Sequence, residues 1–182
     1  MAKQFAAMSD ALMRFVKRQR IFFAASAAPG TRVNVSPRDT RHLRVVDETT
    51  VIWLDMVGSG SETAAHLKAD GRLTLMFCAF EGPPMILRLY GRGTSLVRGT
   101  DGYETLLDAH FDGKAPVNAR QIVRLDADLV QTSCGYSVPL FDFVEDRDVL
   151  DKWAERKGPD DIDTSIAENN AVSMDGLPTG LR

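Results

Sequence analysis

The fold is decided between Val51 and Gly93, by the stretch VIWLDMVGSGSETAAHLKADGRLTLMFCAFEGPPMILRLYGRG. Its first residues, Val51–Leu54, are mostly β-branched or aromatic and favour a half-buried strand. Gly58–Gly60 then ends that strand, because glycine frees the backbone and serine hydrogen-bonds to it. The stretch therefore begins with a strand that stops at a tight polar turn.

A short helix is predicted after the turn, over Glu62–Asp70. Ser61 is a suitable N-cap, and Gly71 stands where a left-handed residue commonly ends a helix. The first-turn N–H groups of a helix lack partners inside it, and the helix dipole is positive at that end. The pattern predicts an anion site at Ser61, although a serine at a helix start is often only a cap.

Two further strands complete the stretch. Leu73–Phe80 is apolar on both of its alternating faces, which is typical of a strand covered on both sides. Met85–Arg92 instead alternates apolar residues with Arg88, Tyr90 and Arg92. One face of this strand is expected in the core, and the other faces water, a ligand or a partner.

The N-terminal part predicts a helix and a hairpin. Ser9–Arg20 has apolar residues at helical spacing. Ile21–Ser26 and Arg32–Ser36 predict two strands joined by a Pro-Gly turn, with Pro37 ending their pairing. Beyond the central stretch we expect a helix over Asp101–Phe111, a strand over Gln121–Val130 and a last helix over Glu145–Lys157.

About six strands with short connections predict a small antiparallel barrel with added helices. We expect one domain over residues 1–157. The polar segment 158–182 has the composition of a flexible tail, or it packs on the barrel or on a partner subunit.

Composition limits the class of protein. With 182 residues, 44% of them apolar and 26% charged, the chain is typical of a globular protein. A net charge of −3 argues against a general nucleic-acid binder, and no apolar run is long enough to span a membrane. Two cysteines, Cys78 and Cys134, and three scattered histidines suggest neither a disulfide framework nor a metal site. We expect a reduced, cytoplasmic protein.

From Ile21 to Pro139 the order of elements resembles the pyridoxamine 5′-phosphate oxidase-like family, the FMN-binding split barrel. Ser61–Gly71 carries most of the likeness: a serine, two polar residues, a helix, a leucine, and then Asp-Gly. Four shorter phrases occur in the same order as in one subgroup of the family: VNVSPR (33–38), FEGPP (80–84), LRLYGRG (87–93) and SCGY (133–136).

The resemblance implies a mainly β fold, a six-stranded antiparallel split β-barrel with flanking helices. It also implies a homodimer that binds FMN in two clefts between the subunits and carries out redox chemistry on a small molecule. It assigns no catalytic residue. Asn34, Ser36 and Arg38 would contact the ribityl chain and phosphate; Ser61, Glu62 and Thr63 the phosphate; Trp53, Leu54 and Asp55 the ring edge; and Arg88 the ring, from the other subunit.

Several alternatives stay open. The family often has basic residues after the serine, whereas this chain has Glu62 and Thr63. A carboxylate beside a phosphate is unfavourable unless it turns away, caps the helix or pairs with His66. The phosphate charge would then fall to Arg38 together with Arg41 or Arg44.

The residues that hold pyridoxal phosphate in true oxidases have no clear counterpart, so vitamin B6 oxidation is not expected. On residue chemistry alone, Trp53 fits a core position, and Arg88 an ordinary exposed strand position. A deazaflavin or haem site, or a flavin-binding module without turnover, remains an alternative function.

Overall fold

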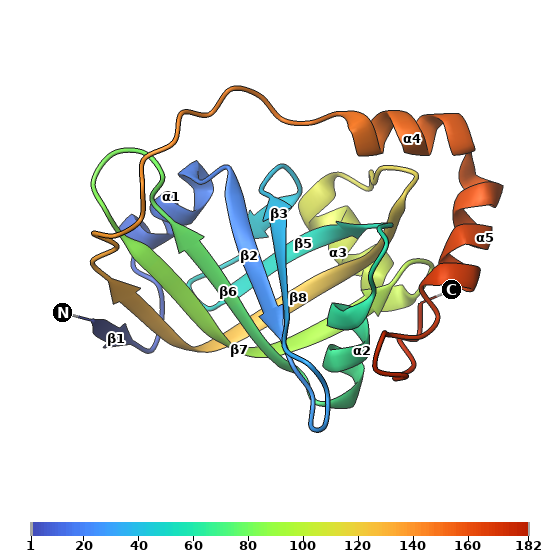
Figure 1. Cartoon of the computed structure of the whole chain (residues 1–182), viewed down its shortest axis with the longest axis horizontal. Helices are drawn as coiled ribbons and strands as arrows, with labels where there is room; N and C mark the ends of the chain where they lie inside the picture. The colour runs from blue at the N-terminus through green and yellow to red at the C-terminus, as the bar shows by residue number, and fades with distance from the viewer. Residues whose placement is uncertain (1, 182) are drawn as a thin grey trace.

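A computed structural model describes residues 2–181 of the chain. Eight strands form one antiparallel sheet in the order β3-β2-β6-β7-β8-β5-β4, and β1 pairs with β8 (Figure 1). The strands are β1 Lys3–Phe5, β2 Ile21–Ser26, β3 Asn34–Asp39, β4 Leu43–Val45, β5 Thr50–Met56, β6 Arg72–Cys78, β7 Ile86–Val97 and β8 Ala119–Ser133.

The predicted mainly β, antiparallel split barrel with flanking helices is confirmed, but its strand count is higher than six. The additional strands, β1 and β4, contain three residues each. A segment of three residues is too short to show the alternation by which strands are recognised.

Five helices flank the sheet: α1 Asp10–Arg18, α2 Glu62–Ala69, α3 Asp101–Phe111, α4 Val149–Lys157 and α5 Pro159–Asn169. The bounds of α3 are those predicted, while α4 begins four residues later than expected. None of the helices within residues 2–181 combines the length and hydropathy needed to cross a lipid bilayer.

Aromatic packing fills the inner side of the sheet. The ring of Phe22 lies 5.5 Å from that of Trp53, edge to face, and stacks at 5.8 Å on Phe77. Helix α3 covers the opposite side of β5 and β8 through Tyr103 and Leu107. Strand β5 is therefore buried on both faces, and its last residues stop at the polar turn that begins the site.

Strand β3 corrects the prediction made for Pro37. The pairing of β3 with β2 continues through Pro37 and Arg38 to Asp39. The prediction was wrong because β3 is the edge strand of the sheet, and an edge strand tolerates a proline whose missing N–H falls on the unpaired side. The continued pairing fixes Arg38 beside β5.

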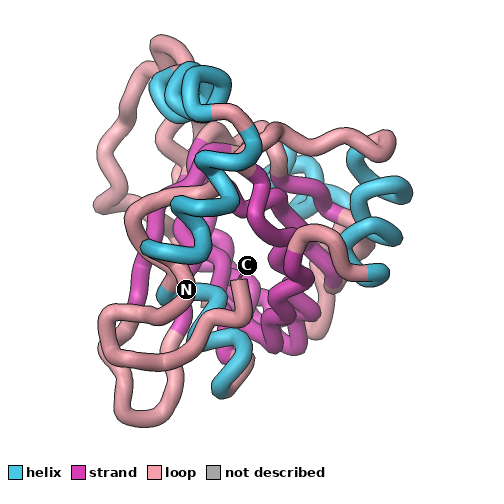
Figure 2. The backbone as a smooth tube through the Cα atoms, turned by 90° about the vertical axis from the view of Figure 1, so that its right-hand side faces the viewer, coloured by secondary structure: helices cyan, strands magenta, loops and turns pink. Residues whose placement is uncertain are grey.

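The C-terminal segment is ordered against the barrel. Helix α5 begins at Pro159, a favourable first-turn position for proline, and buries Ile162 and Ile166 against Val57 and Ala64. In Figure 1, α5 and the C-terminal end lie beside α2, while α4 lies above them at the top right; Figure 2 shows α5 in front of the strands. The division of the chain at residue 157 stays a prediction.

Candidate functional site

A cavity of about 520 Å³ opens between β3, the end of β5 and the turn before α2. Its volume lies in the range of small-molecule and cofactor sites. Eight of the ten predicted site residues line it: Asn34, Ser36, Arg38, Trp53, Leu54, Ser61, Glu62 and Thr63. The lining also includes residues that were not predicted, among them His42, Met56, Val57, Gly58–Gly60, Arg120 and Leu150.

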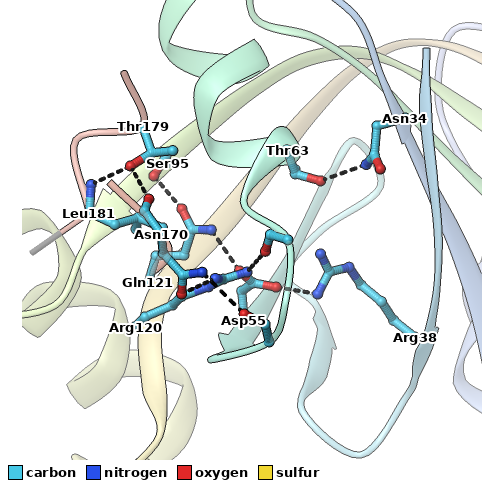
Figure 3. A network of polar contacts seen from close by, with 12 residues as sticks. Asn34, Arg38, Asp55, Thr63, Ser95, Arg120, Gln121, Asn170, Thr179 and Leu181 are labelled. Carbon is cyan, nitrogen blue, oxygen red and sulfur yellow. Dashed lines mark hydrogen bonds and ion pairs between the residues drawn. The ribbon is translucent and has the colours of Figure 1, made fainter. Parts of the chain in front are cut away.

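Strand β3 contributes one polar face to the cavity. Its burial alternates, so Asn34, Ser36 and Arg38 lie on the more buried side. The side-chain amide of Asn34 donates to Ser36 Oγ and to Thr63 Oγ1, each at 3.2 Å. The bond from Asn34 to Thr63 joins β3 to the first turn of α2 (Figure 3).

The first turn of α2 presents unused donors. Ser61 is the N-cap residue, but its side chain does not cap the helix; Oγ donates to Val172 O at 3.5 Å instead. The first backbone bond of the helix runs from Ala65 N–H to Ser61 O. Within residues 2–181, the N–H groups of Glu62, Thr63 and Ala64 have no acceptor. Three donors at the positive end of a helix make a suitable anion site.

Glu62 lies beside these donors and does not pair with His66. Its carboxylate accepts a hydrogen bond from Met174 N–H at 3.2 Å, and the side chain folds back over Gly60. His66 instead lies 3.0 Å from the hydroxyl of Ser26. Of the alternatives open for Glu62, pairing with His66 therefore does not occur, because the C-terminal segment offers the carboxylate a backbone donor.

Asp55 lies behind the cavity wall, with no exposed surface. Its carboxylate forms an ion pair with Arg38 and accepts hydrogen bonds from Arg120 Nε at 2.9 Å and Gln121 Nε2 at 2.7 Å (Figure 3). Burial alone would raise the pKa of Asp55, but the two guanidinium groups and the amide hold it below the ordinary value. Asp55 thus acts as a buried anchor for two arginines.

Arg120 is a charged site residue that the sequence did not reveal. Only 4% of it is exposed, and it donates to Gly60 O at 2.9 Å and to Asn170 Oδ1 at 2.7 Å as well as to Asp55. Strand β8 was expected to begin two residues later, at Gln121, and so to leave Arg120 out. The available signal was a pair of adjacent polar residues, Arg120-Gln121, directly before the segment in which apolar and polar residues alternate.

Two buried donors at the cavity have no partner in the described chain. They are Arg38 Nε and Trp53 Nε1, and the Arg38 guanidinium lies 5.8 Å from the centre of the Trp53 ring. Buried donors without partners are costly and uncommon in folded proteins. Their position beside a cavity is explained if a bound ligand supplies the acceptors.

The charges around the cavity are mixed. Arg38 and Arg120 are accompanied by Asp39 and Glu62 in the lining. Burial lowers the pKa of His42, although Asp39 acts in the opposite direction, so the imidazole is neutral near pH 7. The lining of this chain therefore has no excess of cations.

Three other arginines lie away from the cavity. Arg41 pairs with Asp151 at 2.8 Å, and Arg44 lies over the Phe111 ring, so neither reaches the place expected for a phosphate. Arg88 is on β7, with Nη1 3.5 Å from Ser133 Oγ. Its contact with a flavin in another subunit stays a prediction.

The sequence was compared with known proteins. Residues 8–134 match the family described as Pyridoxamine 5′-phosphate oxidase. The chain belongs to this family. It is 35% identical over 189 residues to the pyridoxamine 5′-phosphate oxidase family protein ustO of Aspergillus flavus, covering 94% of this chain and 75% of that protein.

Two solved structures resemble the fold of this family member. HupZ from Group A Streptococcus, in a variant form, superimposes with a TM-score of 0.55 at 14% identity, over 69% of this chain and 98% of that one. A pyridoxamine 5′-phosphate oxidase-related, FMN binding protein from Nostoc punctiforme gives a TM-score of 0.51 at 13% identity, over 69% and 84%. At these identities the likeness concerns the fold alone.

Proposed function

We propose that this pyridoxamine 5′-phosphate oxidase family protein binds FMN in the cavity beside α2 and uses it for redox chemistry on a small molecule. The observation that carries the proposal is the set of unused donors on one cavity, namely the first-turn N–H groups of α2 together with Arg38 Nε and Trp53 Nε1. The Nostoc punctiforme protein has the same fold and is named as FMN binding, which supports a flavin as the ligand.

The residues of the cavity fit the parts of this cofactor. The N–H groups and hydroxyls at Ser61 and Thr63 suit a phosphate, because they lie at the positive end of α2. The hydroxyl and amide of Ser36 and Asn34 suit the ribityl chain, and Trp53 and Leu54 suit the edge of the ring. FMN, when bound, would accept and pass on electrons or a hydride, while the protein binds and orients it.

We also propose that the site is completed by a second copy of the chain. Apolar side chains lie exposed on the segment between β8 and α4, where Leu140 is 73% and Val144 is 88% exposed. Exposed apolar groups grouped in this way commonly mark a protein interface. Sedimentation velocity at several protein concentrations tests this: a dimer supports the proposal, and a monomer both with and without FMN contradicts it.

A visible spectrum and a titration test the cofactor. Protein that is yellow, or that quenches FMN fluorescence saturably, supports the proposal. A Soret band would instead indicate haem, and no binding of FMN would overturn the flavin assignment. Arg38→Ala should weaken FMN binding by about tenfold or more, the usual effect of losing a hydrogen bond to a charged group. Arg44→Ala, outside the cavity, is the matched control and should bind FMN as the wild type does.

Turnover is tested on the FMN-loaded protein. Reduction of the bound flavin by a nicotinamide donor, followed by reoxidation, supports an oxidoreductase. If the protein binds FMN but a panel of nicotinamide and chemical donors does not reduce it, the result favours a flavin-binding module over an enzyme.

A further inference from the structure

The C-terminal segment reaches the cavity through a chain of buried polar groups (Figure 3). Thr179 Oγ1 accepts from Leu181 N–H at 3.1 Å and donates to Asn170 O at 2.6 Å. Asn170 has no exposed surface, and Thr179 is 2% exposed. These contacts fix the end of α5 and place the Asn170 side chain beside Arg120.

Both ends of the Asn170 amide are used at the turn before α2. Oδ1 accepts from Arg120 Nη1 at 2.7 Å, and Nδ2 donates to Gly58 O at 3.1 Å. Arg120 in turn donates to Gly60 O at 2.9 Å. Two carbonyls of the Gly58–Gly60 turn are therefore held on the side of Asn170 and Arg120.

The direction of these two carbonyls also fixes the direction of the N–H groups that follow them. In a trans peptide, the carbonyl of one residue and the N–H of the next point in opposite directions. Because Gly58 O and Gly60 O are turned toward Asn170 and Arg120, the N–H groups of Ser59 and Ser61 point away from them. Both serines line the cavity, and neither N–H group has an acceptor within residues 2–181.

We propose that Asn170 is a positioning residue of the cofactor site. Acting directly on Gly58 and through Arg120 on Gly60, it presents the N–H groups of Ser59 and Ser61 to the anionic end of the ligand. The C-terminal segment is thus part of the site, although the Asn170 side chain is not among the groups that line the cavity. Where it names FMN as the ligand, this inference rests on the proposed function.

The test compares Asn170→Ala with Ser173→Ala. Ser173 is on the same segment, is 6% exposed, and accepts from Leu177 N–H at 3.1 Å without touching the cavity, so it is the matched control. Asn170→Asp is the conservative variant, since a carboxylate still accepts from Arg120 but cannot donate to Gly58 O. Urea unfolding of each variant establishes that it is folded.

Two measurements are made on each variant. FMN affinity should fall by about tenfold in Asn170→Ala, while the affinity for riboflavin, which has no phosphate, should change by less than about threefold. The backbone ¹⁵N order parameters of Ser59 and Ser61, measured by NMR without cofactor, should fall from about 0.85, typical of a rigid backbone, to about 0.6 or below. Ser173→Ala should change neither quantity, and Asn170→Asp should give intermediate effects on both.

Each result decides the inference. Equal order parameters at Ser59 and Ser61 in Asn170→Ala and Ser173→Ala would overturn it, as would equal losses of FMN and riboflavin affinity. If the wild type binds no FMN, the proposed function fails, and the order-parameter measurement still shows whether Asn170 positions the turn. If Asn170→Ala does not fold, the comparison is made between Asn170→Asp and Ser173→Ala.

Discussion

Replacing Asp55 by asparagine tests the buried charge arrangement behind the cavity. The change keeps the size of the side chain but removes the charge that holds Arg38 and Arg120. Arg38 is 20% exposed in its side chain and can turn toward the cavity, whereas the Arg120 side chain is 4% exposed and stays buried. The variant should therefore leave Arg120 as a buried cation without a counter-charge.

The expected loss of stability depends on the hydrogen-bond acceptors that Arg120 keeps in the variant. Removing one partner of a buried ion pair costs about 3–5 kcal/mol. Arg120 keeps Gly60 O and Asn170 Oδ1 as acceptors, so we expect the lower end, about 3 kcal/mol. With a urea dependence of about 2 kcal/mol per molar, the midpoint of unfolding should fall by about 1.5 M.

The effect should also depend on pH. The pKa of Asp55 is depressed in the folded state, so its contribution to stability is complete above the unfolded pKa, near pH 4, and is lost as the pH falls through the folded value. The difference in unfolding free energy between wild type and Asp55→Asn should be constant from pH 5 to 7 and should narrow below about pH 4.

Urea unfolding followed by circular dichroism at several pH values measures both effects. Asp126→Asn is the control, because Asp126 pairs with Arg124 at the surface, and the loss should stay below about 1 kcal/mol. A loss below about 1 kcal/mol for Asp55→Asn at pH 7, equal to that of the control, would refute the view that Asp55 anchors Arg120.

Three further changes test single residues. Glu62→Gln should raise FMN affinity about fivefold, since it removes about 1 kcal/mol of repulsion at a partly exposed site, and leave riboflavin affinity unchanged; equal FMN affinity would mean that Glu62 points away. Gly91→Ala should cost about 2 kcal/mol or more in urea unfolding, because its methyl group would overlap Asp126 O; Gly58→Ala, with open space at its Cβ, is the control. Arg88→Ala should make bound flavin harder to reduce, and an unchanged midpoint potential would reject that role.

Local patterns were sufficient for the long elements of the fold. The alternation along β7 and the helical spacing of α3 are properties of continuous segments, and both elements occur where they were predicted. The pairing of β3 was misjudged, because the tolerance of Pro37 depends on the edge position of its strand. Helix α5 was missed because Ile162 and Ile166 lie within a polar composition and are buried only by tertiary contact.

The candidate site, like the fold, could be predicted from the sequence only in part. The residues expected from the polar turn and from β3 do line one cavity, because each group lies on a continuous segment. Arg120 and Asn170 could not be assigned, since their contacts with Asp55 and with Gly58 join residues 65 and 112 positions apart. Such contacts follow from the closure of the sheet and the return of the C-terminal segment, which no local pattern describes.

The charge balance of the cavity connects the proposals. The negative charge of Asp55 offsets one of the two positive charges of Arg38 and Arg120. Asp39 and Glu62 carry two further negative charges and outweigh the remaining positive one, so this chain alone offers a phosphate no surplus of positive charge. An anion in this cavity must then be held by N–H donors, by cations from a second copy, or by both. The first possibility gives the Gly58–Gly60 turn and its support by Asn170 their importance. Arg88, which lies outside this chain's cavity, is instead predicted to act on the ring of a flavin bound to a partner, not on its phosphate. Asn170→Ala and Arg88→Ala separate these two roles, because one residue supports the cavity wall of its own subunit and the other is proposed to act on its partner's flavin.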